Sequence, residues 1–284
     1  MFVILSGLAL GATYASVALV YNLTYATSGV LSITAGFTFM IGGVLGAYFL
    51  GTIGLAPVPA LFATLVAGAL MGLAVEFVAV RRVLGRSDQH LWLLSTLAFS
   101  TILQQVVALW WGTEPRRFPR LFAQEFGGLA DQKYWLPILT VLATALVLEA
   151  FLRWTVLGKL FSAVSDDPQA AAARGIPVNA VRAGSFALAG MVGTLAGFVA
   201  GQLTFAFFAL GFMLTLNGFI ALAIGGLGST VGALVGGMLL GLLTAFATYF
   251  FGGAFQNSIS TGLLVVMLLI RPEGIFGRRG ARMV

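Results

Sequence analysis

Few residues of this sequence could take part in chemistry, and none of them forms a recognised catalytic motif. The chain has no HExxH, no GxSxG, no pair of aspartates inside an apolar run and no GxxxxGK loop to bind nucleotide phosphates. It also has no cysteine, and its single histidine, His90, cannot form a metal site alone. The sequence therefore predicts no enzyme active site and no cofactor or metal bound by this chain.

The polar segment at residues 153–182 interrupts an otherwise apolar chain and carries its own helix signals. Asp167 can cap a helix that begins at Pro168, and Gly175 followed by Pro177 ends that helix. The sequence predicts a short, alanine-rich helix that docks a partner outside the membrane. We call residues 153–182 the docking segment.

The composition predicts the scaffold that must hold this segment. The chain is 60% hydrophobic and 8% charged, with a mean hydropathy of +1.02 and repeated apolar runs of roughly 20 residues. The first 21 residues have no basic start and no cleavage site, so they are expected to form a span and not a signal peptide. We predict an all-α polytopic transmembrane helix bundle that forms one domain over residues 1–284.

Apolar runs between polar breaks predict about nine spans, within a range of eight to ten. The predicted spans are residues 2–21, 37–55, 57–80, 91–111, 134–152, 182–201, 205–225, 229–251 and 257–270. Basic clusters follow the third span, lie in the docking segment and end the chain, so the positive-inside rule places them and the C-terminus in the cytoplasm. These clusters account for the net charge of +6, and no nucleic-acid partner is predicted.

Residues 22–36 are too polar and too short to cross a membrane alone, since a span needs roughly 20 residues. They are expected to form a re-entrant half-helix, with nine crossings and the N-terminus outside, or a short broken helix, with ten crossings and both termini inside. Irregular backbone at membrane depth must be surrounded by protein or line a water-filled cavity. The segment is therefore a candidate for the transport pathway.

A glycine pattern recurs in the two halves of the chain. Gly29 is followed seven residues later by Gly36-Phe37, and Gly211 is followed seven residues later by Gly218-Phe219. Paired, glycine-interrupted segments of this kind point to a transport site between two repeats. Thr34 and Asn217 lie just before the two Gly-Phe pairs, so both are candidate pathway residues.

Two carboxylates, Glu76 and Glu149, lie within or beside apolar runs. Such residues are candidates for proton transfer, but arginines lie within one or two helical turns of both. We therefore predict ion pairs with Arg81, Arg82 and Arg153 near the membrane surface.

Five motifs, taken in order, make the sequence similar to a known family. They are residues 7–36, GLALGATYASVALVYNLTYATSGVLSITAG; Glu76 with Arg81 and Arg82; residues 157–176, LGKLFSAVSDDPQAAAARGI; residues 223–241, AIGGLGSTVGALVGGMLLG; and residues 268–277, LLIRPEGIFG. The chain resembles the permease family of branched-chain amino acid ABC importers, in the shorter of its two permease types. The resemblance covers nearly the whole chain.

The resemblance implies a type II ABC importer-like permease whose short cytoplasmic helix docks in a groove of an ATPase. Its partners would be a second permease subunit, in a homo- or heterodimer, two ATPases that bind ATP and magnesium, and an external substrate-binding protein in a bacterial or archaeal inner membrane. Substrate would cross by alternating access. The implied ATPase-coupling residues are Asp166, Asp167, Pro168, Ala171, Arg174, Gly175 and Ile176.

One departure from the family concerns the substrate. Members usually carry Ala-His-Gly-Glu where this chain has Thr34-Ala35-Gly36-Phe37, so the histidine is replaced by Ala35 and the carboxylate by Phe37. A more apolar path predicts a branched-chain amino acid or a related hydrophobic or aromatic small acid as substrate. The predicted pathway residues are Thr34, Ala35, Gly36, Phe37, Asn217 and Gly218.

Two other functions compete with this one. An ion-gradient-driven transporter or channel would need a charged residue at mid-membrane, whereas this chain has its charges near the span ends. A scaffold subunit that transports nothing would not need glycine-broken interior segments.

Overall fold

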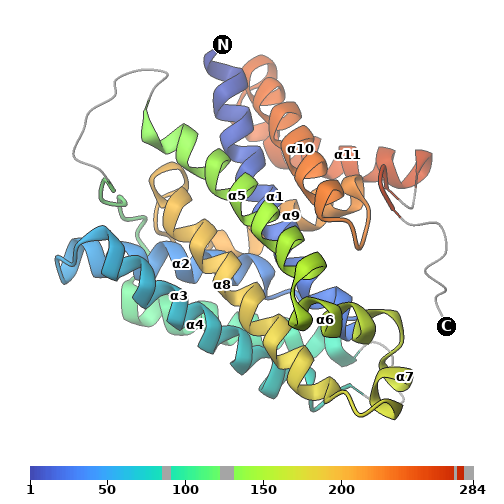
Figure 1. Cartoon of the computed structure of the whole chain (residues 1–284). Helices are drawn as coiled ribbons and strands as arrows, with labels where there is room; N and C mark the ends of the chain where they lie inside the picture. The colour runs from blue at the N-terminus through green and yellow to red at the C-terminus, as the bar shows by residue number, and fades with distance from the viewer. Residues whose placement is uncertain (85–90, 122–130, 272–273, 278–284) are drawn as a thin grey trace.

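The computed structural model describes residues 1–84, 91–121, 131–271 and 274–277, and these residues form a bundle of helices (Figure 1). The α-helices are α1 (Phe2–Ser28), α2 (Ala35–Ala47), α3 (Pro57–Ala74), α4 (Leu91–Trp111), α5 (Gln132–Trp154), α6 (Val156–Asp166), α7 (Pro168–Ala173), α8 (Val178–Thr204), α9 (Leu210–Gly225), α10 (Thr230–Phe251) and α11 (Gln256–Ile270). The π-helical turns η1 (Tyr48–Thr52) and η2 (Val75–Val80) continue α2 and α3, and the 3₁₀ turn η4 (Gly253–Phe255) precedes α11. The predicted all-α class is confirmed.

Length and composition agree with a polytopic membrane protein. Within the described residues, seven helices are long and apolar enough to cross a bilayer. They are Phe2–Ser28, Ala35–Thr52, Pro57–Val80, Leu91–Trp111, Gln132–Trp154, Val178–Thr204 and Thr230–Phe251, and α9 is a shorter apolar helix of 16 residues.

Contacts between distant parts of the chain define two ends of the bundle. At the N-terminal end, the ring of Phe2 packs edge-on against Tyr134, with 5.5 Å between centroids. At the opposite end, the side-chain amide of Asn22 donates to the carbonyl oxygen of Ser229 at 3.0 Å. Helices α6 and α7 lie at this opposite end, away from the N-terminus, so we call it the docking end (Figure 1).

Residues 22–36 adopt neither of the predicted forms. Helix α1 continues through Ser28 and ends at Gly29, whose φ of 67° is left-handed and whose N–H bonds to the carbonyl oxygen of Tyr25 at 2.8 Å. The hydroxyls of Thr24 and Ser28 donate to carbonyl oxygens one turn earlier, so α1 satisfies these polar groups internally. Residues 29–34 then form a break, and α2 begins at Ala35.

The two halves of the bundle repeat one arrangement in opposite directions. Helices α1 and α8 each have 27 residues, each is followed by a short break, and the shorter helices α2 and α9 come next. Helix α10 packs along α1 as α3 packs along α8. Because α1 runs towards the docking end and α8 away from it, the repeat is inverted.

Small residues permit the equivalent close contacts in both halves. A Cβ atom added to Gly68 or Gly72 of α3 would collide with the backbone of α8 at Gly190 or Phe186. In the other half, Gly237 and Gly241 of α10 lie equally close to the backbone of α1. Spacing of small residues by one helical turn is typical of tightly packed membrane helices.

The predicted register of the repeat is wrong by seven residues. Ala35 and Leu210 begin α2 and α9, so Gly36 corresponds to Gly211 and not to Gly218. A Cβ atom on Gly36 would collide with the carbonyl oxygen of Gly211, and one on Gly211 would meet the ring of Phe37. The starts of the two broken helices therefore face each other inside the bundle.

Candidate docking and transport sites

The centre of the docking segment folds as its cap residues predict. The carboxylate oxygen Oδ1 of Asp167 accepts hydrogen bonds from the backbone N–H groups of Gln169 at 2.8 Å and Ala170 at 3.0 Å. Pro168 occupies the first turn of α7, where no N–H is needed. The helix ends at Ala173, and Gly175 after the C-cap residue has a φ of 80° and donates its N–H to the carbonyl oxygen of Ala172.

Helix α7 has one buried residue and a broad exposed face. Ala171 is 4% exposed and packs into an apolar cluster with Phe161, Val164 and Val181, against which Ile176 also packs. The exposed residues are Asp166, Asp167, Pro168, Gln169, Ala170, Ala172, Ala173, Arg174 and Gly175. Of the predicted coupling residues, Ala171 and Ile176 therefore anchor the helix from within, while the others can reach a partner.

Helix α6 was missed by reasoning from the sequence. The hydroxyl of Thr155 caps it by accepting the N–H of Gly158 at 3.0 Å, and Gly158, Phe161 and Val164 are its buried residues. Its signal is the apolar set Leu160, Phe161 and Val164, whose spacing is that of one helix face. Through Phe161, this helix forms the cluster on which α7 sits.

The predicted pathway residues are buried inside the helix bundle. Thr34, Ala35, Phe37 and Asn217 are exposed by 3%, 1%, 2% and 5%, respectively. The segment 34–37 lies against the start of α9, whereas Gly218 lies against Val17 of α1. The amide of Asn217 donates within its own helix to the carbonyl oxygen of Met213 at 3.0 Å. The structure thus brings the first four residues, and not the last two, to the contact between α2 and α9.

Thr215 is the polar residue that joins these two helices. Its Oγ1 accepts the N–H of Gly36 at 3.1 Å and lies 3.1 Å from the carbonyl oxygen of Ile33. It also lies 2.7 Å from the carbonyl oxygen of Gly211 in its own helix. Reasoning from the sequence assigned this threonine no pathway role, although its position four residues after Gly211 is a usable signal.

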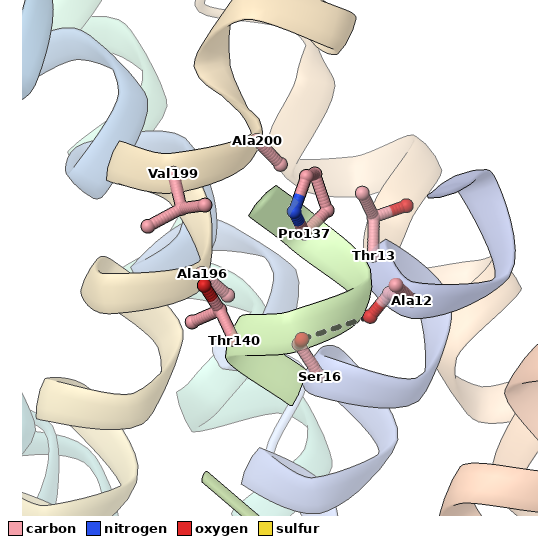
Figure 2. Close-up of a pocket in the computed structure, with 8 residues that line it drawn as sticks. All are labelled: Ala12, Thr13, Ser16, Pro137, Thr140, Ala196, Val199 and Ala200. Atoms are coloured by element: carbon pink, nitrogen blue, oxygen red, sulfur yellow. Dashed lines mark hydrogen bonds between the residues drawn. The ribbon is translucent and has the colours of Figure 1, made fainter. Parts of the chain in front are cut away.

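A small void lies beside Pro137, where α1, α5 and α8 meet (Figure 2). Three hydroxyl-bearing residues, Thr13, Ser16 and Thr140, line it, but it has no space for a water molecule. The hydroxyl of Ser16 donates to the carbonyl oxygen of Ala12 at 2.8 Å, as the dashed line in Figure 2 marks. In this conformation the void is a packing gap and not a passage.

A cavity of about 70 Å³ lies at the docking end of α1. Its walls are apolar at Leu19, Leu23 and Phe161 and neutral but polar at Asn22 and Ser185. Phe161 belongs to α6, so the docking segment forms part of the wall. Neither this cavity nor the void at Pro137 is lined by the predicted pathway residues.

Both carboxylates form ion pairs, but Arg82, one of the three predicted partners, is not among the arginines that pair with them. Arg81 bonds Glu76 at 3.0 Å and Arg153 bonds Glu149 at 2.6 Å, as expected. The guanidinium of Arg82 instead lies over the ring of Phe77, 5.7 Å from its centroid. A second arginine on Glu76, Arg182, was not predicted. His90 lies outside the described residues.

Comparison with known proteins agrees with these features. The family model described as "Branched-chain amino acid transport system / permease component" matches residues 3–271. BraD, a high-affinity branched-chain amino acid transport system permease protein of Pseudomonas aeruginosa, is 30% identical over 97% of this chain and 95% of its own. LivH of Escherichia coli K12, which carries the same description, is 28% identical over 96% of this chain and 94% of its own.

Similarity extends to an archaeon and to a solved structure. A probable branched-chain amino acid transport permease protein LivH of Methanocaldococcus jannaschii is 29% identical over 92% of this chain and 87% of its own. The solved structure of PsaBC from Streptococcus pneumoniae in complex with Fab has a TM-score of 0.54 and 13% identity, covering 97% of this chain and 92% of that one. At this identity the likeness concerns the fold alone.

Proposed function

Because this chain belongs to the family of permease components of branched-chain amino acid transport systems, we propose that it is the membrane subunit of an ATP-driven importer. The observation that carries the proposal is α7, a capped helix at one end of the bundle with an exposed face of small residues. Because this chain has no nucleotide-binding loop, a partner ATPase must hydrolyse the ATP. The ATPase needs such a contact to drive a conformational change in this chain.

The partners follow from this role. The exposed face of α7, with Asp166, Asp167, Pro168, Arg174 and Gly175 around it, docks in a groove of a cytoplasmic ATPase, while Ala171 and Ile176 hold the helix on α6. Two ATPases, which bind ATP and magnesium, act on this chain and on a second permease subunit. An external binding protein delivers substrate to the opposite face.

In the orientation we propose, the docking end lies in the cytoplasm of a bacterial or archaeal cell and the N-terminal end lies outside. Arg81, Arg153 and Arg182 lie at the docking end, in accord with the positive-inside rule. With α2 and η1 counted as one span and α9 and α11 as short ones, the chain crosses the inner membrane nine times and its C-terminus is cytoplasmic.

The transport step is alternating access. Closure of the ATPases moves α7 and, through it, α8, so that the contact between α2 and α9 changes. Thr34, Ala35, Gly36 and Phe37 lie at that contact, and Asn217 and Gly218 lie further along α9. Discontinuous helices that meet inside an inverted repeat are typical of transport sites.

We assign the substrate to branched-chain amino acids or related hydrophobic or aromatic small acids. The relatives that match most of this chain are named for branched-chain amino acid transport. The ring of Phe37 at the α2–α9 contact makes this region apolar and favours an apolar side chain on the substrate.

Reconstitution in proteoliposomes tests the function. The permease, its partner permease and the ATPases are reconstituted, and uptake of radiolabelled leucine, isoleucine, valine and phenylalanine is measured in the presence of the binding protein. We expect uptake that requires ATP hydrolysis and all subunits. Uptake by this chain alone, driven by an ion gradient without nucleotide, would show that it is a secondary transporter or channel.

A further inference from the structure

A buried carboxylate at the docking end holds two arginines from distant parts of the chain. Glu76 is 1% exposed. Its Oε1 and Oε2 accept hydrogen bonds from Nε and an Nη of Arg81, both at 3.0 Å. Oε1 also accepts from Nε of Arg182 at 3.1 Å, across 106 positions of sequence. Hydrogen bonds between ionised groups of this kind are stronger and more directional than neutral ones.

The π-helical turn η2 makes this arrangement possible. The N–H of Arg81 bonds to the carbonyl oxygen of Glu76, five residues earlier, at 2.7 Å. In an α-helix of 3.6 residues per turn, positions five apart point in different directions, whereas a π turn brings them to one side. Such turns recur at functional sites. Here the turn directs Glu76 and Arg81 towards α8.

Arg182 lies where a positive charge is unfavourable without a partner. It is in the second turn of α8 and is only 7% exposed, and a buried charge is costly unless it is paired. Glu76 supplies the compensating charge, and the Oδ1 of Asn179 accepts a further hydrogen bond from Arg182 at 2.9 Å. Arg182 is also near the point where the chain leaves α7 and enters α8.

We propose that Glu76 is a positioning residue for transport, because its pair with Arg182 makes α3 and α8 move as one body when α7 is displaced. This inference rests on the proposed function. A buried ion pair is weak evidence for stability, since apolar residues of similar size are often as stabilising. The close glycine contacts already pack α3 on α8, so the ion pair is not needed to bring the helices together. What it adds is a directional link between the end of α3 and the last residue of the docking segment, Arg182.

Two sets of substitutions separate positioning from stability. The double variant Glu76→Met with Arg182→Met removes both charges and keeps apolar volume. Arg182→Lys keeps the charge but loses the guanidinium that bonds Glu76 and Asn179 together. The control is Glu149→Met, which removes a carboxylate that is paired with the exposed Arg153 at the same end.

The readout is substrate imported per ATP hydrolysed by the reconstituted complex. For the double variant we expect normal assembly, continued ATP hydrolysis and a ratio reduced at least roughly fivefold, the lower end of typical coupling between sites. Arg182→Lys should show a smaller reduction, and Glu149→Met none.

The possible results are distinguishable. If the unaltered complex shows no ATP-dependent uptake, the proposed function fails, and with it the premise of this inference. If the unaltered complex transports and the double variant keeps its ratio, Glu76 has no positioning role. If the double variant does not assemble, Arg182→Lys decides: an unchanged ratio overturns the proposal, and a reduced ratio supports it.

Discussion

The backbone N–H of Gly36 donates a hydrogen bond to the hydroxyl oxygen of Thr215 at 3.1 Å, which joins the first turn of α2 to the second turn of α9. The Thr215 hydroxyl carries one hydrogen, which it can donate to the carbonyl oxygen of Gly211 at 2.7 Å or of Ile33 at 3.1 Å. One side chain can thus hydrogen-bond the polar backbone groups at the buried start of α2. Such pairing is required where helices break inside a bilayer.

The first prediction is that Gly36→Ala destabilises the chain. An added Cβ would collide with the carbonyl oxygen of Gly211 and with the backbone N of Thr215. Overpacking of this kind costs roughly 1–3 kcal/mol and should lower the thermal unfolding midpoint in detergent. The matched control is Gly262→Ala in α11, where no atom lies within 4 Å of the added Cβ. Equal midpoints for the two variants would contradict the close α2–α9 contact.

The second prediction concerns the cap of α7. Asp167→Ala removes the acceptor for the N–H groups of Gln169 and Ala170, which should cost roughly 1 kcal/mol of helix stability and reduce ATP-dependent uptake. Asp167→Asn keeps an acceptor oxygen and should retain most uptake. Uptake by the reconstituted complex and co-purification of the ATPase measure both effects. Equal loss in the two variants would mean that the charge of Asp167, and not its capping, matters.

The cap could be predicted because its signals are local in the sequence. Asp167, Pro168 and Gly175 each act on backbone groups within a few residues, and α7 formed as expected. The boundaries of the buried break could not be predicted. Thr24 and Ser28 look polar in the sequence, but their hydroxyls bond inside α1 and let the helix continue.

Ion-pair partners that are distant in the sequence could not be predicted either. A carboxylate near a run of arginines indicates an ion pair, and Arg81 was found because it is close in sequence to Glu76. Arg182 reaches the same carboxylate only because α8 packs along α3. The register of the repeat was wrong for a related reason, since abundant glycines match at several offsets and only the helix starts decide between them.

The third prediction uses two adjacent residues of α7 to separate the anchoring of this helix in the permease from its docking on the ATPase. Ala172→Glu places a carboxylate on the exposed face of α7, so the isolated permease should unfold at an unchanged temperature while ATPase association is lost. Ala171→Glu places the carboxylate in the cluster around Phe161 and Val164, and should destabilise the permease itself. Thermal unfolding and ATPase pull-down are measured for both variants. Normal ATPase binding by a stable Ala172→Glu variant would move the docking face away from α7.

The fourth prediction is the orientation in the membrane. The chain has no cysteine, so single cysteines can be added without background. Ser165→Cys in α6 and Gly253→Cys in η4 both lie at exposed positions, at the docking end and beyond the far end of α10, respectively. In intact cells, a membrane-impermeant maleimide should label Gly253→Cys and should label Ser165→Cys only after lysis. The reverse pattern would invert the proposed topology.

The fifth prediction is that Phe37 influences substrate preference. Phe37 is 2% exposed, and its ring lies against Gly211 at the start of α9, within the contact that alternating access is proposed to change. Phe37→Leu keeps this position apolar with a smaller side chain. It changes the shape of the contact, so uptake of phenylalanine relative to leucine should shift. Phe198→Leu is the control, because Phe198 is equally buried but packs edge-on against Phe118. A shift of the same size in both variants would show a general packing effect and remove Phe37 from the pathway.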